Sequence, residues 1–425
     1  MKLAIIAGGK GTRLGLKDIP KPMVEIAGKP LLEHQILLAK RYGMDEIYIL
    51  SGHLSHVIRD YFGDGSKWGL KITHIVEREP LGTAGAIKQL EGMIDERFMV
   101  FYGDTMMDID LENFIRHDRE DSLGTLMVHP NDHPYDSDLV DIDKENRIVK
   151  FYSKPHPENV YLPNLVNAAL YIFSPEIFQY IEPGKMQDFG KDIFPRLDNL
   201  YAYKTTEYLK DMGTPERLEK VERDYLSGKI SRLNRSNKQK AIFLDRDGVI
   251  NKEVDNLCTL DEFELLPGVS EALKMINDSE YIAIVVTNQP VIAKGFITEE
   301  ELKQIHNKMA TLLGHDRVFV DDLYYCPHHP EKGFEGEIPE LKIDCDCRKP
   351  KSGMLTRAAE DYNIDLSRSW IIGDRYADIQ AGKNVGCRGI LVETGHAGSD
   401  REKFDVEVDY VEKDLLSAVK NILKV

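Results

Sequence analysis

The sequence predicts two α/β domains, each a doubly wound and mostly parallel sheet covered by helices. Three observations lead to this prediction. The chain has 425 residues, a length that favours two or three domains. Expected strands and helices alternate along both halves. Between the halves, residues 227–240 carry several basic residues, no acidic residue and no apolar periodicity, which is typical of a solvated linker.

The first half shows the strand–helix alternation of a parallel sheet. Runs rich in β-branched and aromatic residues are expected to be strands, and runs with apolar residues at helical spacing are expected to be helices. The strands are 2–8, 45–52, 70–77 and 97–104, and the helices are 31–43 and 53–65. From about residue 125 to 175 we expect shorter strands, with a hairpin turn at 145–147.

A second alternation begins after residue 240. Strands are expected over 241–247, 281–288, 320–326, 369–374 and 388–394, with helices between them. We therefore place the domains at residues 1–228 and 241–425, joined by a linker at 229–240. A nucleic-acid-binding arm is the alternative interpretation of this basic segment.

Composition restricts the partners. The net charge of −17 argues against nucleic acid or an anionic membrane as partner. No run of about 18 uncharged apolar residues is present, and the chain begins with an expected strand rather than a signal peptide. We expect a cytoplasmic protein that acts on small molecules, and homo-oligomerisation stays open. Phosphate substrates would need local cations and backbone N–H groups to overcome the acidic field.

A glycine-rich loop follows the first strand, at the sheet edge where ligands bind in α/β proteins. Glycines let the backbone approach a phosphate, and free N–H groups can cradle it; a simple tight turn is the alternative. The residues that we expect to contact substrate in this loop are Gly8, Gly9, Gly11 and Thr12.

Charged side chains accompany the loop. Arg13 and Lys21 could stabilise charge that develops on an α-phosphate and on a pyrophosphate leaving group. Asp104 ends another expected strand, and Asp211 lies just before a helix start. Two carboxylates from distant segments predict a Mg²⁺ site. A helix-start residue without further role is the alternative for Asp211.

The first half resembles the sugar-1-phosphate nucleotidyltransferases. The resemblance covers about residues 1–228 and depends on six motifs in order, GGKGTRLG…PKPM, LGTAGAI, YGD, VNAALYIF, DFGKDIFPRL and MGTPERL. It implies a Rossmann-like domain in which a sugar-1-phosphate oxygen attacks the α-phosphorus of a nucleoside triphosphate and releases pyrophosphate.

The resemblance also assigns residues. It implies that Gly82 contacts the base or ribose, that Lys154 meets the sugar phosphate and that Asn167 contacts the substrate. Two positions depart from the family pattern: Ser153 stands where Glu is common, and Ala169 stands where Gly is common.

The second half opens with AIFLDRDGV, an apolar strand followed by Asp245 and Asp247. Like charges this close repel each other, so a cation or a proton is expected between them. Alternatively, two aspartates after a strand form an ordinary turn. DRDGV, VVTNQ, CRKP and IIGDRYAD resemble, in this order, the motifs of the haloacid dehalogenase superfamily.

This second resemblance implies phosphoryl transfer in a domain without a large cap. Asp245 would be the nucleophile and Asp247 the general acid and base, and both would hold Mg²⁺ together with Asp374. Thr287 and Lys349 would bind the phosphoryl oxygens. The expected substrate contacts are Asn288, Gln289 and Arg348.

Four of the soft ligands that zinc prefers lie near this motif set. Cys326, His328, Cys345 and Cys347 form C-x-H-x₁₆-C-x-C, which predicts a closed, structural Zn²⁺ site. A chance cluster of free cysteines is the alternative. The DRDGV motif, the segment 326–347 that holds these four residues (the zinc loop) and RKP together resemble the D-glycero-D-manno-heptose 1,7-bisphosphate 7-phosphatases, with histidinol-phosphate phosphatases as relatives. The family's TNQSG is TNQPV here, so Pro290 removes a backbone N–H.

The two resemblances imply one reaction sequence. A heptose bisphosphate 7-phosphatase makes heptose 1-phosphate, and a sugar-1-phosphate nucleotidyltransferase consumes such a product. We therefore expect a bifunctional enzyme of nucleotide-activated heptose biosynthesis for surface glycans such as lipopolysaccharide, with GTP as the favoured nucleotide. Two alternatives stay open: the same activities on another phosphosugar with CTP or dTTP, and one half acting as a binding module without turnover.

Overall fold

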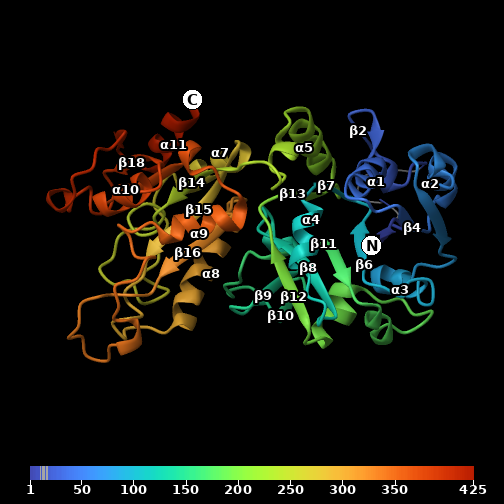
Figure 1. Ribbon diagram of the computed structural model, residues 1–425, viewed down its shortest axis with the longest axis horizontal. Helices are drawn as coiled ribbons and strands as arrows, with labels where there is room; N and C mark the ends of the chain where they lie inside the picture. The colour runs from blue at the N-terminus through green and yellow to red at the C-terminus, as the bar shows by residue number, and fades with distance from the viewer. Residues whose placement is uncertain (10, 12–14, 16–17) are drawn as a thin grey trace. The chain divides into compact units, whose positions relative to one another are not determined.

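The computed structural model describes residues 1–9, 11, 15 and 18–425, which divide into two compact units (Figure 1). The first unit contains Met1–His129, Ser137–Lys154 and Leu165–Asn234. The second unit contains Arg235–Val425 together with two short segments from the first half, Pro130–Asp136 and Pro155–Asn164.

The first unit is built on a mixed sheet with the strand order β10-β9-β11-β6-β1-β4-β5, and β8 lies between β11 and β12. β1 is parallel to both β4 and β6, whereas β11 is antiparallel to β6. The expected parallel sheet is therefore extended by antiparallel strands. The strands are β1 Lys2–Ile6, β4 Glu46–Ser51, β5 Lys71–Val76, β6 Phe98–Tyr102, β8 Gly124–His129, β9 Leu139–Ile142, β10 Ile148–Tyr152, β11 Val166–Phe173 and β12 Leu200–Lys204.

Helices cover both faces of this sheet. Alternate residues of β1 separate into two cores: Leu3 and Ile5 pack with residues of α1, α2 and α4, and Ala4 packs with residues of α3. This alternation is what a strand buried on both faces requires. The helices are α1 Leu31–Arg41, α2 Ser55–Phe62, α3 Gly82–Lys88 and α4 Leu111–His117.

A smaller layer completes the first unit. β7 Thr105–Asp108 pairs with β13 Tyr208–Asp211, and β2 Glu25–Ile26 pairs with β3 Lys29–Pro30. Helix α5 Pro215–Leu226 begins with Thr214, whose side chain accepts from Arg217 N. Part of the predicted linker is folded, because α6 Lys229–Arg232 buries Ile230 in a cluster with Val221.

The second unit is built on a parallel sheet with the order β16-β15-β14-β17-β18-β19. The expected strands of the second half are confirmed, and β19 is an additional edge strand. The strands are β14 Lys240–Leu244, β15 Tyr281–Asn288, β16 Asp322–Cys326, β17 Trp370–Gly373, β18 Arg388–Val392 and β19 Tyr410–Glu412.

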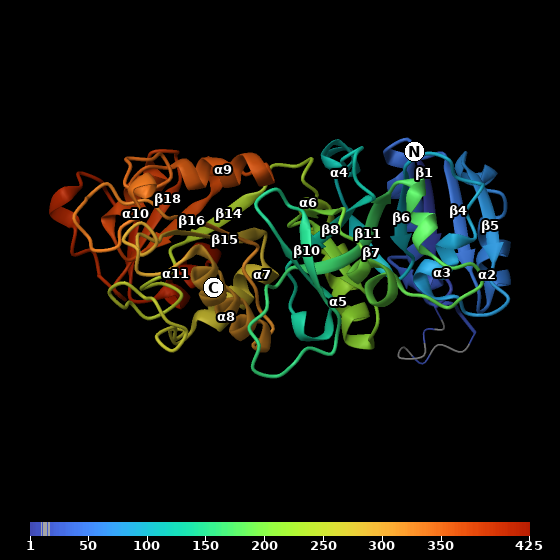
Figure 2. The ribbon, with the colours of Figure 1, turned by 90° about the horizontal axis from the view of Figure 1, so that it is seen from below.

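Helices cover this sheet on both faces as well (Figure 2). Residues of α7, α8 and α11 share one core with β14, whereas α9 and α10 pack on the other face. Helix α8 begins with a capping box of Thr298 and Glu301. The helices are α7 Val269–Asp278, α8 Glu299–His315, α9 Gly353–Tyr362, α10 Tyr376–Lys383 and α11 Leu415–Leu423.

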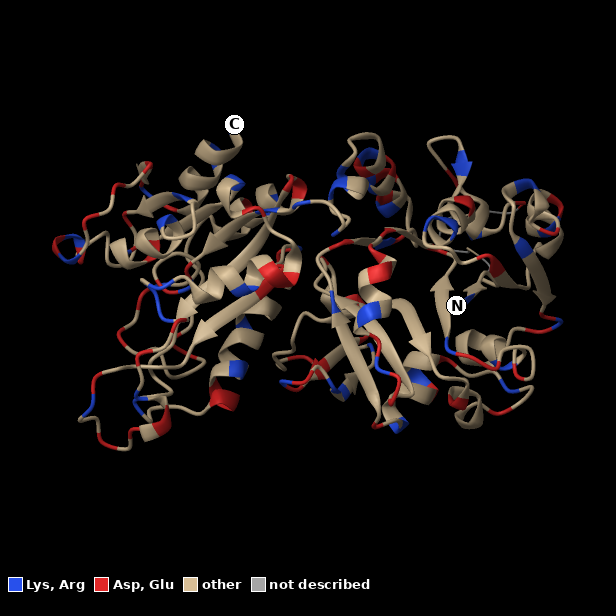
Figure 3. Ribbon diagram, in the orientation of Figure 1, with Lys and Arg blue, Asp and Glu red and all other residues tan. Residues whose placement is uncertain are grey.

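Acidic and basic residues are interspersed along the exposed elements of each unit, as on α5 (Figure 3). Among the described residues, no helix combines the length and the apolar character needed to cross a membrane.

Candidate active sites and zinc loop

The carboxyl edge of the second sheet brings together residues predicted for phosphoryl transfer. Asp245 follows β14, Thr287 lies near the end of β15 and Asp374 follows β17. Because β15 and β17 flank β14, these three strand ends are neighbours. The strand order reverses at β14, and ligands of open α/β sheets bind in the crevice beside such a switch point.

Lys349 is a buried lysine held between two carboxylates. Its Nζ lies 2.9 Å from Asp245 Oδ1 and 2.6 Å from Asp378 Oδ1, and it donates to the carbonyl of Val286 at 2.8 Å. Burial alone would lower the pKa of Lys349, but the two carboxylates outweigh burial and raise this pKa. The ammonium group is therefore charged where a phosphoryl group would approach Asp245.

Two residues predicted to contact substrate make hydrogen bonds within the protein. Asn288 Nδ2 donates to the carbonyl of Lys349 at 3.1 Å, and Asn288 Oδ1 accepts from Lys349 N at 3.0 Å. Gln289 Nε2 donates to Asp247 Oδ2 at 2.8 Å and to Thr287 Oγ1 at 2.9 Å. Asn288 thus holds the backbone of Lys349, and Gln289 holds the side chains of Asp247 and Thr287. The contact of both amides with substrate stays a prediction.

Three buried carboxylates form a group that fits a divalent cation. Asp245, Asp374 and Asp378 each place one oxygen within 4.8 Å of the others. Burial raises the pKa of Asp245 to about 6, and burial together with the charge of Asp245 raises the pKa of Asp374 to about 7. Among the described residues, Asp374 Oδ1 has no hydrogen-bond partner although it is buried. A cation such as Mg²⁺ would satisfy this oxygen and offset the repulsion.

The structure does not bring the Asp247 carboxylate into this group, although the sequence predicted it as a Mg²⁺ ligand. Its oxygens accept hydrogen bonds of 2.8–3.2 Å from Arg246, Asn251 and Gln289. Burial would raise the pKa of Asp247, but Arg246 and these hydrogen bonds hold it below its usual value. Asp378 is the third carboxylate of the group, and its Oδ1 also lies 2.6 Å from Lys349 Nζ.

Two glycines leave room for Asp374. Gly248 and Gly395 have φ angles of 79° and 59°, in the left-handed region, and a Cβ on either would collide with Asp374 Oδ2. The same oxygen accepts from His396 N at 2.6 Å. A larger residue at either glycine would displace the carboxylate from the group.

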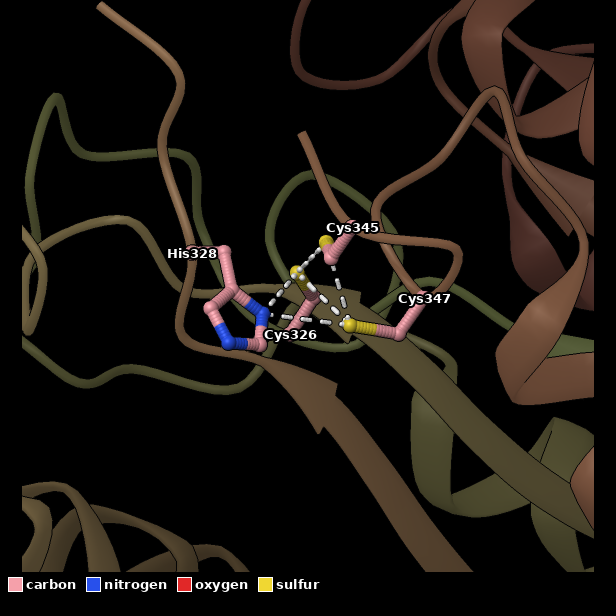
Figure 4. A group of neighbouring side chains, drawn as sticks. All are labelled: Cys326, His328, Cys345 and Cys347. Atoms are coloured by element: carbon pink, nitrogen blue, oxygen red, sulfur yellow. Dashed lines mark hydrogen bonds between the residues drawn. The ribbon is translucent and has the colours of Figure 1, made fainter. Parts of the chain in front are cut away.

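The predicted zinc ligands converge on one point (Figure 4). Cys326 Sγ lies 3.5 Å from Cys345 Sγ and 3.2 Å from Cys347 Sγ, and His328 Nδ1 lies 3.3 Å from Cys347 Sγ. Separations of this size are close to the edges of a tetrahedron with zinc–ligand bonds of about 2.0–2.3 Å. The hydrogen bond between Cys326 and Cys347 lowers the pKa of Cys347 to about 5 and raises that of Cys326. The four ligands fit a closed zinc site.

The zinc loop leads directly into the phosphatase site. Arg348 follows Cys347, and its guanidinium donates to the carbonyl of His328 at 3.2 Å. Lys349 comes next, so its backbone is held by the cysteine cluster on one side and by Asn288 on the other. The predicted contact of Arg348 with substrate stays a prediction.

The glycine-rich loop of the first unit leaves the sheet at its own switch point. β1 lies between β4 and β6, so the loop begins where the strand order reverses. Gly8, Gly9 and Gly11 are described, whereas Thr12 and Arg13 lie outside the described residues. The position of Gly8 therefore agrees with a ligand-binding crevice.

The two aspartates predicted to bind Mg²⁺ lie on adjacent segments. β7 begins directly after Asp104, and its partner β13 ends at Asp211, so that Met212 N donates to the carbonyl of Asp104 at 3.0 Å. Each carboxylate has a cationic partner: Lys21 Nζ lies 2.5 Å from Asp104 Oδ2, and Arg217 Nη1 lies 2.7 Å from Asp211 Oδ2. The oxygen donors fit Mg²⁺, and Lys21 is placed beside them.

A carboxylate that the sequence analysis missed lies beside the glycine-rich loop. Glu77 follows β5 at the carboxyl edge, and a Cβ on Gly8 would lie only 2.6 Å from Glu77 Oε2. Burial raises the pKa of Glu77. Glu77 Oε1 is buried without a hydrogen-bond partner among the described residues. Its place at a strand end, directly before the motif that starts at Leu81, was the available signal.

Three predicted substrate residues of the first unit remain: Lys154 and Asn167 lie beside Asp138, and Gly82 begins α3. Asp138 accepts from Lys154 N through Oδ1 at 3.1 Å and from Asn167 N through its carbonyl at 3.0 Å, so these two predicted sugar contacts are neighbours. Gly82 has a φ of 71°, and a Cβ there would lie 2.5 Å from the carbonyl of Gln187. Only glycine fits this position at the start of α3.

Comparison with known proteins finds relatives for each half of the chain, and they agree with the resemblances noted in the sequence. Residues 2–228 match the nucleotidyl transferase family, and residues 346–418 match the HAD-hydrolase-like family. The D-glycero-beta-D-manno-heptose-1,7-bisphosphate 7-phosphatase of Haemophilus ducreyi is 41% identical over 161 residues, which are 37% of this chain and 86% of that protein. The D-glycero-alpha-D-manno-heptose-1,7-bisphosphate 7-phosphatase of Photorhabdus laumondii is 42% identical over 165 residues, 39% of this chain and 88% of that protein.

A solved structure matches the first half. HddC from Yersinia pseudotuberculosis in complex with GMP-PN is 30% identical and aligns with 53% of this chain and 99% of its own, with a TM-score of 0.47. The chain is a fusion that belongs to the nucleotidyl transferase family through residues 2–228 and to the HAD-like heptose 1,7-bisphosphate 7-phosphatases through its C-terminal half, and it is a bifunctional enzyme.

Proposed function

We propose that the chain carries out two consecutive steps of nucleotide-activated heptose biosynthesis. The second unit removes the 7-phosphate of D-glycero-D-manno-heptose 1,7-bisphosphate, and the first transfers a guanylyl group from GTP to the heptose 1-phosphate that results. The observation that carries this proposal is the coexistence of both sites in one chain, since the product of one is the substrate class of the other. We also propose that residues 1–228 and 241–425 act as separable domains.

In the phosphatase reaction, Asp245 would attack the 7-phosphorus. Its carboxylate oxygen bonds to phosphorus and the bond from phosphorus to the sugar oxygen breaks. Asp247, which is ionised in the free protein, would take up a proton in the substrate complex and give it to that oxygen. Water then attacks the aspartyl-phosphate, returns a proton to Asp247 and releases inorganic phosphate. Lys349 and Thr287 would bind the phosphoryl oxygens; the Lys349 ammonium lies 2.9 Å from Asp245 Oδ1.

Asp245 and Asp374 are the residues that we expect to hold Mg²⁺, which when bound would keep the nucleophile ionised and neutralise phosphate charge. Asp378 serves mainly to hold Lys349, because its Oδ1 lies 2.6 Å from the lysine Nζ. The cysteine–histidine cluster would bind a structural zinc and keep the RKP segment in place.

In the transferase reaction, an oxygen of heptose 1-phosphate would attack the α-phosphorus of GTP, and pyrophosphate would leave. Lys21 and Arg13 would stabilise the charge on the transferred and leaving groups. Asp104 and Asp211 are the residues that would hold Mg²⁺, which would neutralise phosphate charge when bound. Lys154 would contact the sugar phosphate, and Asn167, whose backbone N–H also donates to Asp138, would contact the substrate.

Glu77 supports GTP as the nucleotide. The Watson–Crick edge of guanine offers two adjacent donors, N1–H and the 2-amino group, and an ionised carboxylate can accept both. Adenine, cytosine and thymine do not offer such a pair of donors. Glu77 lies against Gly8, and its Oε1 has no hydrogen-bond partner among the described residues, so a base beside the loop would find a carboxylate acceptor there.

The test mixes heptose 1,7-bisphosphate with GTP, ATP, CTP or dTTP and Mg²⁺, and identifies the sugar nucleotide by mass. GDP-heptose is expected. Inosine triphosphate, which lacks the 2-amino group, should be a poorer donor than GTP, and Glu77→Gln should lower kcat/KM for GTP about 10²-fold. CDP- or dTDP-heptose as the main product would contradict the guanylyl assignment, and an unchanged GTP preference in Glu77→Gln would remove Glu77 from it.

A further inference from the structure

Arg246 is an arginine without solvent exposure that lies, in sequence, between the two proposed catalytic aspartates. Its Nη2 donates to both oxygens of Asp247 at 2.8 Å, and its Nε donates to Asp247 Oδ1 at 3.2 Å. Nη2 also lies 3.2 Å from Gln289 Oε1. The guanidinium therefore determines how the Asp247 carboxylate is oriented.

His306, on α8, holds the other end of this guanidinium. Arg246 Nη1 lies 3.1 Å from His306 Nε2. Arginine can only donate hydrogen bonds, so Nε2 must be the acceptor and His306 must be neutral, with its proton on Nδ1. Burial and the nearby Arg246 charge lower the pKa of His306 to about 3, which agrees with a neutral ring.

The contacts form a connected chain. His306 accepts from Arg246, Arg246 holds Asp247, and Gln289 joins Asp247 to the Thr287 hydroxyl. Asn251 Nδ2 adds a further hydrogen bond to Asp247 Oδ1 at 2.9 Å. A carboxylate without this support could rotate about its side-chain bonds, and a proton donor that points away from the leaving oxygen is ineffective.

We propose that His306 and Arg246 are positioning residues that hold the Asp247 carboxylate toward the leaving oxygen of the substrate. This inference rests on the proposed phosphatase function. A purely structural role, in which the two residues only fill the interior, is the competing explanation.

The two explanations differ in how the loss depends on the leaving group. In the first step, the bond from Asp245 to phosphorus forms while the sugar oxygen departs and takes a proton from Asp247. A sugar alkoxide is a poor leaving group and needs this proton. p-Nitrophenolate departs as a stable anion, so the first step with p-nitrophenyl phosphate does not need a well-placed acid.

The test measures the first turnover by rapid quench for both substrates, with Mg²⁺ and zinc-loaded full-length protein. In His306→Phe, release of heptose 1-phosphate from the bisphosphate should fall about 10²-fold. Release of the first equivalent of p-nitrophenolate should stay within about threefold of wild type, since the chemistry at Asp245 is preserved. KM for the bisphosphate should change little, because His306 does not touch substrate.

Three further variants complete the test. His306→Gln retains an acceptor and should restore most of the lost rate, and His315→Phe, at the exposed end of the same helix, should behave as wild type. Arg246→Lys keeps the positive charge but loses the planar set of N–H donors that holds Asp247. Its loss of rate should depend on the leaving group in the same way as that of His306→Phe. If His306→Phe does not fold, Arg246→Lys alone distinguishes the positioning role from a purely structural one.

An equal loss on both substrates, or no loss in His306→Phe and Arg246→Lys, would overturn the positioning role. A wild-type protein that releases p-nitrophenolate but leaves the heptose bisphosphate intact would contradict the proposed substrate. That outcome is distinct from a failure of the positioning role, which requires bisphosphate hydrolysis by wild type and equal losses in the variants.

Discussion

At the scale of single residues, Ala169 shows how backbone geometry explains a departure from a family pattern. Its φ is 57°, in the left-handed region, at an irregularity in the pairing of β11 with β8 between Asn167 and Tyr171. Related nucleotidyltransferases commonly have glycine here, and the left-handed conformation costs an alanine about 1–2 kcal/mol. The chain therefore retains a bulge that its sequence does not favour.

We expect Ala169→Gly to stabilise the first unit. Glycine relieves the strain but also gains freedom in the unfolded chain, so the net gain in the free energy of unfolding should be about 0.5 kcal/mol. Urea denaturation followed by tyrosine fluorescence would measure it. Ala168→Gly, one residue earlier in the same strand, is the matched control and should destabilise. A lower denaturation midpoint for Ala169→Gly than for wild type would contradict the argument.

The raised pKa values of Asp245 and Asp374 predict how Mg²⁺ binding depends on pH. Both groups must be ionised to bind the cation, so its affinity should rise between about pH 6 and 8. In metal-free protein, folded-state pKa values of about 6 and 7 lie above the usual value of about 3.9. The protons contribute stability that is present at low pH and lost as the pH rises through about 7.

Thermal unfolding with and without Mg²⁺ checks this prediction. The increase in Tm caused by Mg²⁺ should be small at pH 5 and largest near pH 8. Asp374→Asn should lose this pH-dependent increase, and any increase that remains would come from the proposed Mg²⁺ site of the first unit. A shift that is largest at pH 5 would mean that these carboxylates do not hold the cation.

Charged side chains at strand ends could be found from sequence, whereas their orientation could not. The motifs located Asp245, Asp374 and Lys349, and the structure places them together. Glu77 lies at the end of an expected strand, but one glutamate among many has no distinctive spacing, and its packing against Gly8 is visible only in the structure. The sequence also cannot show that Arg246 holds the Asp247 carboxylate, because that arrangement depends on His306 and Gln289, which are distant in the chain.

At the scale of elements, the zinc loop connects the candidate zinc ligands to Lys349, which we propose to bind phosphate. We expect Cys345→Ser to lower the zinc content toward zero and to reduce phosphatase activity at least tenfold, because Lys349 follows the loop directly. Zinc would be measured by mass spectrometry of the purified protein. Cys258→Ser removes a cysteine outside the cluster and should leave both quantities unchanged. A variant that keeps both zinc and activity would exclude Cys345 as a ligand.

Long apolar strands could be predicted from the sequence, whereas short strands that depend on a distant partner strand could not. The runs around β1, β4, β5, β6 and β14 are long, apolar and bounded by turns, so local sequence identifies them. β7 and β13 are each short and depend on a partner about a hundred residues away. The basic segment after residue 228 looks like linker, yet α6 forms because Ile230 can be buried against α5. Tertiary contacts decide such cases.

At the scale of the whole molecule, each unit contains its own core and its own candidate catalytic set. We therefore expect Asp245→Asn to abolish phosphate release while transfer of GMP to supplied heptose 1-phosphate stays near wild type. Asp104→Ala should reduce pyrophosphate release about 10²-fold or more and leave phosphate release near wild type. Both products would be measured in the same assay mixture.

Loss of the activity assigned to the other unit, in either variant, would show that the two activities depend on each other. If Asp245→Asn also stopped nucleotidyl transfer, or Asp104→Ala also stopped phosphate release, the proposed separation into two catalytic domains would be wrong. Asp121→Ala, a change in an exposed carboxylate of the first unit, is a control that should affect neither activity.

We expect the proposed zinc site to make the phosphatase activity sensitive to the redox state of the cell. All five cysteines lie after residue 257, and three of them have sulfur atoms only 3.2–3.5 Å apart. An oxidant that joins two of these thiols removes two zinc ligands and loosens the segment that carries Lys349. The first half has no cysteine to lose. Under oxidative stress, the chain would stop making heptose 1-phosphate while remaining able to consume it.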